Sequence, residues 1–111
     1  MTEDITTFPT HPATRVTVML SPSDRAGHHS LLREVLKRAR QNKLAGATAL
    51  RGYAGYGTSG VVHRSHVVRE DPPSAVVLVD RPERIQSFLD DVGPLLREVL
   101  VIVKDVDVVE V

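Results

Sequence analysis

The sequence has no cysteine among its 111 residues. This absence excludes disulfide bonds, thiolate metal ligands and cysteine nucleophiles, so a metal site would have to use histidine and carboxylate ligands. Aromatic residues are also scarce, with two Phe, two Tyr and no Trp. A surface that stacks unpaired bases on aromatic rings therefore has little support, and we expect no nucleic-acid partner.

Long apolar runs are absent as well. No stretch approaches the roughly 20 consecutive apolar residues that a membrane helix needs, and the N-terminus lacks the basic and apolar regions of a secretory signal. We therefore expect a cytoplasmic protein. With 41% hydrophobic residues, the chain can bury one core of ordinary size and is too short for two typical domains.

The formal net charge is zero, but the charges are unevenly spread along the chain. The segment from Arg25 to Arg69 holds nine basic residues against Glu34 alone, whereas Glu70 to Val111 holds ten acidic residues against four basic ones. This asymmetry fits either a basic face for an anionic ligand or complementary surfaces between subunits. A structural role is the commoner outcome, because solvated charge covers most exposed helix faces.

The first half of the chain predicts a tail, a strand and a helix. Residues 1–13 are rich in Thr and Pro without periodicity, so we expect a disordered tail before a single domain at 14–111. Alternating apolar residues predict a strand at 14–20. Ser30 is a predicted N-cap for a helix that ends near Lys43. The expected apolar stripe of this helix consists of Leu32, Val35, Leu36 and Ala39.

The second half repeats this pattern. We expect a half-buried strand at 45–53, an extended segment at 61–69 and a buried strand at 75–79. Asp80 is the predicted cap of a second helix, which the pair Gly93-Pro94 kinks or splits. Residues 100–103 and 106–111 are extended, with a bend or bulge at Lys104-Asp105 where the alternation changes phase. The order predicts an α+β, ferredoxin-like βαββαβ fold, a four-stranded antiparallel sheet with two helices on one face.

Candidate binding residues concentrate between Gly46 and Gly60, where a short strand pattern runs into glycines. Gly55 and Gly57 supply backbone that a ligand can approach closely, and their N–H groups could face an anion, although no Walker motif follows. A glycine-rich hairpin without a ligand is the alternative. Arg51 could bind a phosphate or carboxylate, or form a salt bridge between subunits. The tyrosines at 53 and 56 could stack on a base, with packing the expected role.

The segment from Gly46 to Gly57 resembles a bacterial and archaeal family of uncharacterised PII-like proteins. The resemblance extends to the lead-in at 43–48, to His63, to 76–80 and to 106–109. It implies a homotrimer with nucleotide sites between subunits and a flexible loop after the second strand, here Gly55 to His66. Gly46 with Thr48, and Gly55 with Gly57, resemble the Gly-x-Thr and Gly-x-Gly elements of PII proteins. The phosphate loop that PII proteins place before the last strand has no counterpart at 95–104.

Together these observations predict a non-enzymatic regulator without a cofactor, catalytic residues or a metal site. It would sense a small anionic ligand such as an adenine nucleotide, and its Gly55 to His66 loop would reach a transporter or an enzyme. The predicted ligand-binding residues are Gly46, Thr48, Arg51, Gly52, Gly55 and Gly57. The alternatives are a protein-only adaptor, a trimer of the divalent-metal-tolerance type, or a small enzyme similar to acylphosphatases.

The enzyme and metal alternatives rest on few residues. Acylphosphatases use an Arg in the first loop with an Asn on a neighbouring strand, whereas the only Asn here is Asn42, at the end of the first helix. His63 and His66 are three apart on a predicted strand and therefore point to opposite faces. His28 and His29 lie in a turn, where solvated side chains are the ordinary outcome. The sequence assigns no role to these four histidines.

Overall fold

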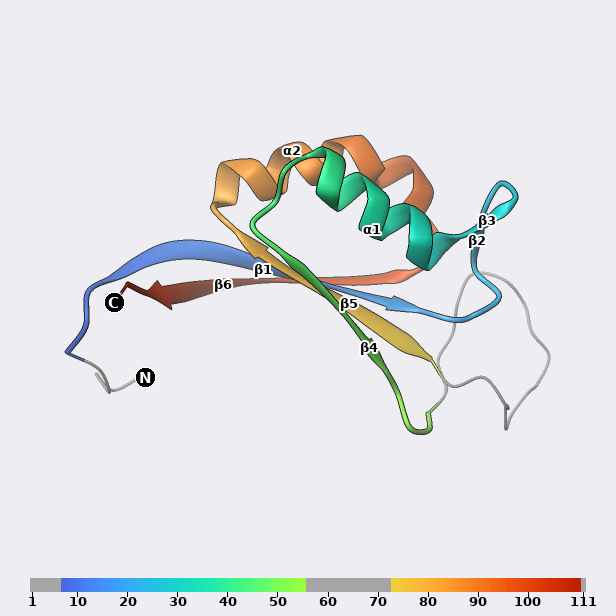
Figure 1. Cartoon of the computed structure of the whole chain (residues 1–111), viewed down its shortest axis with the longest axis horizontal. Helices are drawn as coiled ribbons and strands as arrows, with labels where there is room; N and C mark the ends of the chain where they lie inside the picture. The colour runs from blue at the N-terminus through green and yellow to red at the C-terminus, as the bar shows by residue number, and fades with distance from the viewer. Residues whose placement is uncertain (1–6, 56–72, 111) are drawn as a thin grey trace.

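The computed structural model describes residues 7–55 and 73–110, which form a two-layer α+β domain (Figure 1). Four strands make an antiparallel sheet in the order β4-β5-β1-β6, and both helices lie over one face of it. The strands of this sheet are β1 (Thr10–Leu20), β4 (Ala47–Arg51), β5 (Ser74–Asp80) and β6 (Leu100–Val109). The remaining elements are the strands β2 (Arg25–Ala26) and β3 (His29–Ser30), the helices α1 (Leu31–Gln41) and α2 (Pro82–Val92), and a 3-10 turn, η1 (Gly93–Leu96). The predicted ferredoxin-like fold is confirmed.

The core lies between the helices and the sheet. Every second residue of β1 and β5 faces the helices, and the fully buried side chains of the two layers pack against one another. This packing accounts for most of the stability that hydrophobic burial can supply. The buried core consists of Val16, Val18, Leu20, Val76 and Leu78 from the sheet, Leu31, Val35 and Ala39 from α1, and Ile85, Phe88, Val92 and Leu96 from α2 and η1.

The start of α1 follows the predicted capping chemistry. The Ser30 hydroxyl accepts the backbone N–H of Arg33 at 3.1 Å, as an N-cap side chain does. The helix ends at Gln41, two residues before the predicted end, because Lys43 adopts a left-handed φ of 59° that turns the chain toward β4. The hairpin of β2 and β3 was not predicted. It forms around Gly27, whose φ of 65° suits a residue without a Cβ atom.

The N-terminal boundary of β1 differs from the prediction. β1 begins at Thr10 rather than at residue 14, so residues 10–13 belong to the sheet and not to a disordered tail. Pro12 is tolerated there because β5 ends its pairing at Thr14, and among the described strands only β6 pairs with residues 10–13. Residues 1–6 of the predicted tail lie outside the described residues.

The predicted bend at Lys104-Asp105 is wrong. β6 pairs with β1 in one unbroken register from Leu100 to Val109, without an inserted residue. The alternation changes phase at Asp105 for another reason. Asp105 pairs with Thr14, which also pairs with the last residue of β5, so the three-stranded part of the sheet ends there. Beyond it, β1 and β6 form a two-stranded ribbon.

Two smaller expectations concern α2. The helix ends at Val92 and continues as η1, so Gly93-Pro94 splits it. The residue in the N-cap position is Arg81, whose side chain makes no capping bond, and Asp80 precedes it. Asp80 is therefore not the cap. Its carboxylate has a different role, described below.

Candidate functional site

The candidate ligand residues follow the edge strand β4. Gly46 and Thr48 lie at its beginning, whereas Arg51 and Gly52 lie at its end, with Gly55 beyond. Because a strand rises about 3.3 Å per residue, Gly46 and Gly52 are separated by about 20 Å. The protomer therefore does not gather these residues into one pocket. Gly57 lies outside the described residues.

β4 was predicted to be half-buried, and this is wrong. All five of its residues are exposed, since β4 pairs only with β5 and the helices cover the centre of the sheet. The register places Thr48 opposite Val77, on the face away from the helices, and Arg51 opposite Ser74, on the other face. Arg51 makes no ion pair within the described part of the chain. Tyr53 is 97% exposed, so the packing role expected for it is not observed.

Two of the glycines are explained by the structure, Gly52 by Pro73 and Gly55 by its backbone conformation. The backbone N–H of Gly52 donates to the Pro73 carbonyl oxygen at 2.7 Å, and a Cβ atom on Gly52 would lie 2.8 Å from the same oxygen. Gly55 has a φ of 156°, a backbone conformation that residues with a Cβ atom rarely adopt, and its contact with the Pro73 ring is an ordinary one. These glycines thus close the end of β4 against the start of β5, a structural role that the sequence did not reveal.

Gly46 has no such explanation. Its φ lies outside the positive range, and a Cβ atom built on it would meet nothing within 4 Å. Neither backbone conformation nor packing inside the described protomer therefore requires glycine here. A side chain at this position would instead extend into the space beside the edge strand, where another molecule could approach the backbone.

The lead-in to Gly46 is held by Asp80 at the end of β5. The Asp80 carboxylate accepts the backbone N–H of Ala45 at 2.8 Å and that of Arg81 at 2.7 Å. Arg84 donates to the same carboxylate at 3.3 Å and to the Lys43 carbonyl oxygen at 2.6 Å. Burial opposes ionisation of Asp80, but these N–H donors and Arg84 outweigh it and lower the pKa of the carboxyl group below 3.8. We call this set of hydrogen bonds to the Asp80 carboxylate the Asp80 clasp. The sequence did not predict it, because Asp80 and Ala45 are 35 positions apart.

The face of the sheet away from the helices carries a band of apolar side chains. Two cross-strand rows form it, apolar except for Thr17 and Thr48, and each row crosses all four strands. The larger members, Met19, Leu50, Leu100 and Ile102, are 36–58% exposed. Adjacent exposed apolar side chains of this size are typical of an interaction surface. The rows are Leu50, Ala75, Met19, Leu100 and Thr48, Val77, Thr17, Ile102.

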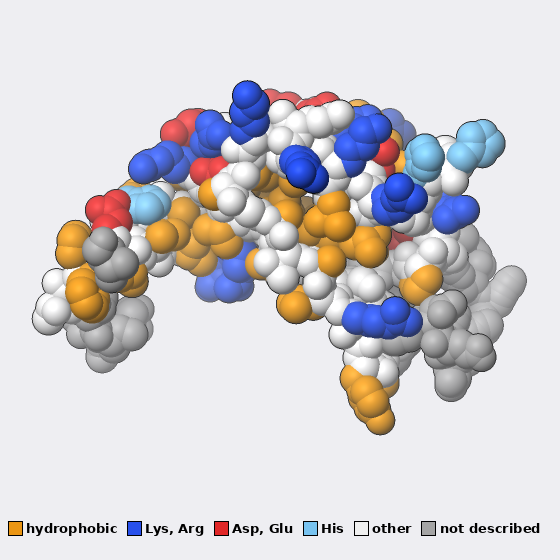
Figure 2. All heavy atoms as spheres, in the orientation of Figure 1, with side chains coloured by type: hydrophobic (Ala, Val, Ile, Leu, Met, Phe, Trp, Pro, Cys, Tyr) orange, Lys and Arg blue, Asp and Glu red, His pale blue; other side chains and the backbone are white. Residues whose placement is uncertain are grey.

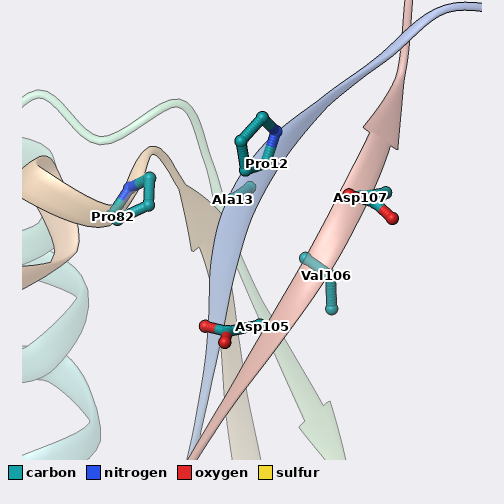
Figure 3. Close-up of a pocket in the computed structure, with 6 residues that line it drawn as sticks. All are labelled: Pro12, Ala13, Pro82, Asp105, Val106 and Asp107. Atoms are coloured by element: carbon teal, nitrogen blue, oxygen red, sulfur yellow. The ribbon is translucent and has the colours of Figure 1, made fainter.

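A shallow hollow of about 360 Å³ lies between β1, β6 and the start of α2 (Figure 3). Pro12 and Pro82 form its apolar walls, and Asp105 and Asp107 contribute carboxylates. β6 is the sheet edge opposite β4, and none of the candidate ligand residues on or beside β4 lines the hollow. Two carboxylates also make it unsuitable for an anionic ligand.

The described residues contain no group of three potential metal ligands from His, Cys, Asp and Glu. His28 and His29 are exposed in the β2–β3 hairpin, and His63 and His66 lie outside the described residues. The Asn42 amide donates to the Arg38 carbonyl oxygen at 2.8 Å and to Asp91 at 3.0 Å, which gives it a structural role at the end of α1. No helix in the described ranges is long and apolar enough to cross a membrane.

Comparison with known proteins relates this chain to one family and one architecture. The model of the DUF190 family, described as Uncharacterized ACR, matches residues 13–108. A UPF0166 protein of Aquifex aeolicus (strain VF5) is 35% identical over 60 residues, which are 52% of this chain and 57% of that protein. The match thus spans little more than half of that relative.

Solved structures of CPII, a nitrogen regulatory PII-like protein from Thiomonas intermedia K12, share the fold. The form bound to ADP, AMP and bicarbonate has a TM-score of 0.66 at 14% identity, covering 93% of this chain and 99% of that one. The apo form has a TM-score of 0.65 at 12% identity, covering 94% and 99%. The architecture is therefore PII-like.

Proposed function

This chain belongs to the DUF190 family, and we propose that it is a PII-like trimeric regulatory protein. In this proposal it senses a small anionic ligand, an adenine nucleotide, at the boundary between subunits. It signals the bound state to a transporter or an enzyme through the Gly55 to His66 loop, without catalysing a reaction. The observation that carries the proposal is the near full-length likeness to CPII, one structure of which holds ADP, AMP and bicarbonate.

The position of β4 supports a ligand site between subunits. Gly46 and Thr48 are exposed at a sheet edge that no described residue of the same chain covers. A bound nucleotide would need walls on both sides to exclude water, and a second subunit beside β4 would supply the missing wall. The unoccupied space at Gly46 lets a phosphate approach the backbone.

The apolar band on the open sheet face supports the trimer. Its side chains cross all four strands and include Leu50, Leu100 and Ile102, each 45–58% exposed. Covering such a band by identical faces of other subunits removes it from water in a closed symmetric assembly. The predicted mass is that of three 12.2 kDa chains, and light scattering at micromolar concentration measures it. A mass of one chain would refute the assembly.

Calorimetry tests the ligand directly. We expect ADP, AMP or ATP to bind the trimer, and bicarbonate and cyclic nucleotides complete the panel. A ligand at a hundred times its dissociation constant should raise the free energy of unfolding by about 2.7 kcal/mol. Gly46→Ala should leave the fold intact and weaken binding, because the new methyl group fills the approach to the backbone. Glu98→Ala, an exposed change after η1, is the matched control.

The protein-only adaptor is the second candidate, and the dispersal of the predicted ligand residues along about 20 Å of strand favours it. In that case no nucleotide binds at millimolar concentration, yet the Gly55 to His66 loop still recovers a partner protein. An acylphosphatase-like enzyme has less support, because the Asn42 side chain is engaged in hydrogen bonds at a helix end.

A further inference from the structure

The two helices expose faces of opposite charge. α1 carries Arg33, Lys37, Arg38 and Arg40 against one acidic residue, Glu34. That single carboxylate is paired with Arg38 at 2.9 Å, and Arg38 also reaches Asp91 of α2 at 3.1 Å. Arg33, Lys37 and Arg40 remain exposed, and none of them forms an ion pair within the described ranges. Figure 2 shows Lys and Arg side chains gathered over α1.

These three residues form a stripe along one side of the helix. Their spacing of four and then three places them on one face, and the stripe is about 10 Å long at 1.5 Å rise per residue. We call Arg33, Lys37 and Arg40 the basic stripe. It lies on the helix layer, on the opposite side of the molecule from the apolar band of the sheet. Self-association through that band would therefore leave the basic stripe accessible.

We propose that the basic stripe docks an acidic segment of a partner protein. The charge of the stripe is complementary to carboxylates spaced along a single strand or helix, and such complementarity steers association and fixes the orientation of the partner. The acidic residues of α2 disfavour partners with a broad anionic surface. Its exposed Glu83 and Asp90 lie on the helix packed beside α1, so a broad anionic surface would meet acidic charge as well as basic.

This geometry disfavours a membrane or a nucleic acid as the occupant. None of the exposed large hydrophobic side chains among the described residues belongs to α1 or α2, so the helix layer has no apolar group to insert into lipid. A DNA duplex laid along α1 would bring its phosphates close to the exposed Glu83 and Asp90 of α2, which repel them. A narrow acidic peptide avoids both difficulties.

The test uses a labelled peptide of alternating Glu and Ala as the probe, with its Gln and Ala counterpart as the neutral comparison. We expect the full chain to bind only the acidic peptide in fluorescence anisotropy, more weakly as salt rises toward about 0.15 M. Lys37→Gln with Arg40→Gln should weaken binding about fivefold. Arg81→Gln with Arg97→Gln removes the same charge from exposed positions off the stripe and should change binding less than about twofold.

Three results would overturn the proposal. The first is no binding of the acidic peptide by the unmodified chain at low salt. The second is an equal loss in both double variants, which would reduce the effect to net charge. The third is tighter binding of duplex DNA or of vesicles with anionic lipid, lost in the stripe variant. Light scattering checks that both variants keep the assembly of the parent, and since no nucleotide is present, the test is independent of the proposed ligand.

Discussion

Replacing Asp80 by Ala is the most direct test of how the lead-in to β4 is held. The change removes one carboxylate that accepts two backbone N–H groups, at 2.7 and 2.8 Å, and its side chain is only 10% exposed. A hydrogen bond to a charged group contributes about 1.5–3 kcal/mol. Arg84 is 45% exposed and adds little. Since the freed N–H of Ala45 can bind water, we expect a loss of about 2–4 kcal/mol in the free energy of unfolding.

Urea denaturation at pH 7, followed by circular dichroism at one fixed chain concentration, measures this loss. Asp80→Asn keeps one carbonyl acceptor and should lose about half as much. Asp90→Ala is the matched control, because Asp90 is exposed and accepts only from Gln86, at 3.1 Å. Its effect should stay within about 0.5 kcal/mol. If Asp80→Ala and Asp90→Ala destabilise the protein equally, the clasp does not hold β4.

The same carboxylate predicts a pH dependence. Its pKa is lowered in the folded protein, so the stabilisation it supplies is fully present above the ordinary value of 3.8 and is lost as pH falls through the lower folded pKa. The stability difference between the parent and Asp80→Ala should therefore be constant from neutral pH down to about 5 and shrink below 3.8. A difference that grows on acidification would contradict the assignment.

Three further changes test the cap, the glycines and the apolar band. Ser30→Ala should cost about 1 kcal/mol in unfolding free energy, measured in urea, because it removes the N-cap acceptor of α1. Gly52→Ala should lower the free energy of unfolding by about 1–3 kcal/mol, because the new Cβ atom would lie 2.8 Å from the Pro73 carbonyl oxygen. Gly46→Ala should lower it by less than about 0.5 kcal/mol, and equal losses in the two variants would refute the packing argument. Ile102→Asp on the open face should dissociate the proposed trimer in light scattering, whereas Val103→Asp, similarly exposed on the helix side, should not.

Much of the fold could be predicted because its signals are local. The alternation from Val16 to Leu20 identifies the central strand, since one face of β1 is buried under the helices. Ser30 predicts the start of α1, because its hydroxyl accepts the backbone N–H of Arg33, three positions away. Gly93-Pro94 ends α2, because proline has no N–H to continue the ladder. Each of these depends on a few neighbouring residues.

The errors in β1 and β6 arose where the structure depends on which strands are paired. Pro12 reads as a strand breaker, yet it is accommodated because no strand pairs with its other side. The change of phase at Asp105 reads as a bulge, but it marks the point where β5 ends and the ribbon of β1 and β6 continues alone. Neither fact is visible until the strand order and register are known.

The candidate site, too, was predicted only in part from the sequence. The sequence by itself determined that Gly52 and Gly55 stand at the end of a strand and that charge is segregated along the chain. The tertiary structure decided that Pro73 requires glycine at position 52, that the space around Gly46 is open, and that the Asp80 carboxylate binds the backbone N–H of Ala45. It also decided that the apolar band exists, since each strand supplies only two of its residues and cross-strand pairing brings them together. Contacts between residues far apart in sequence follow from packing, which no local pattern encodes.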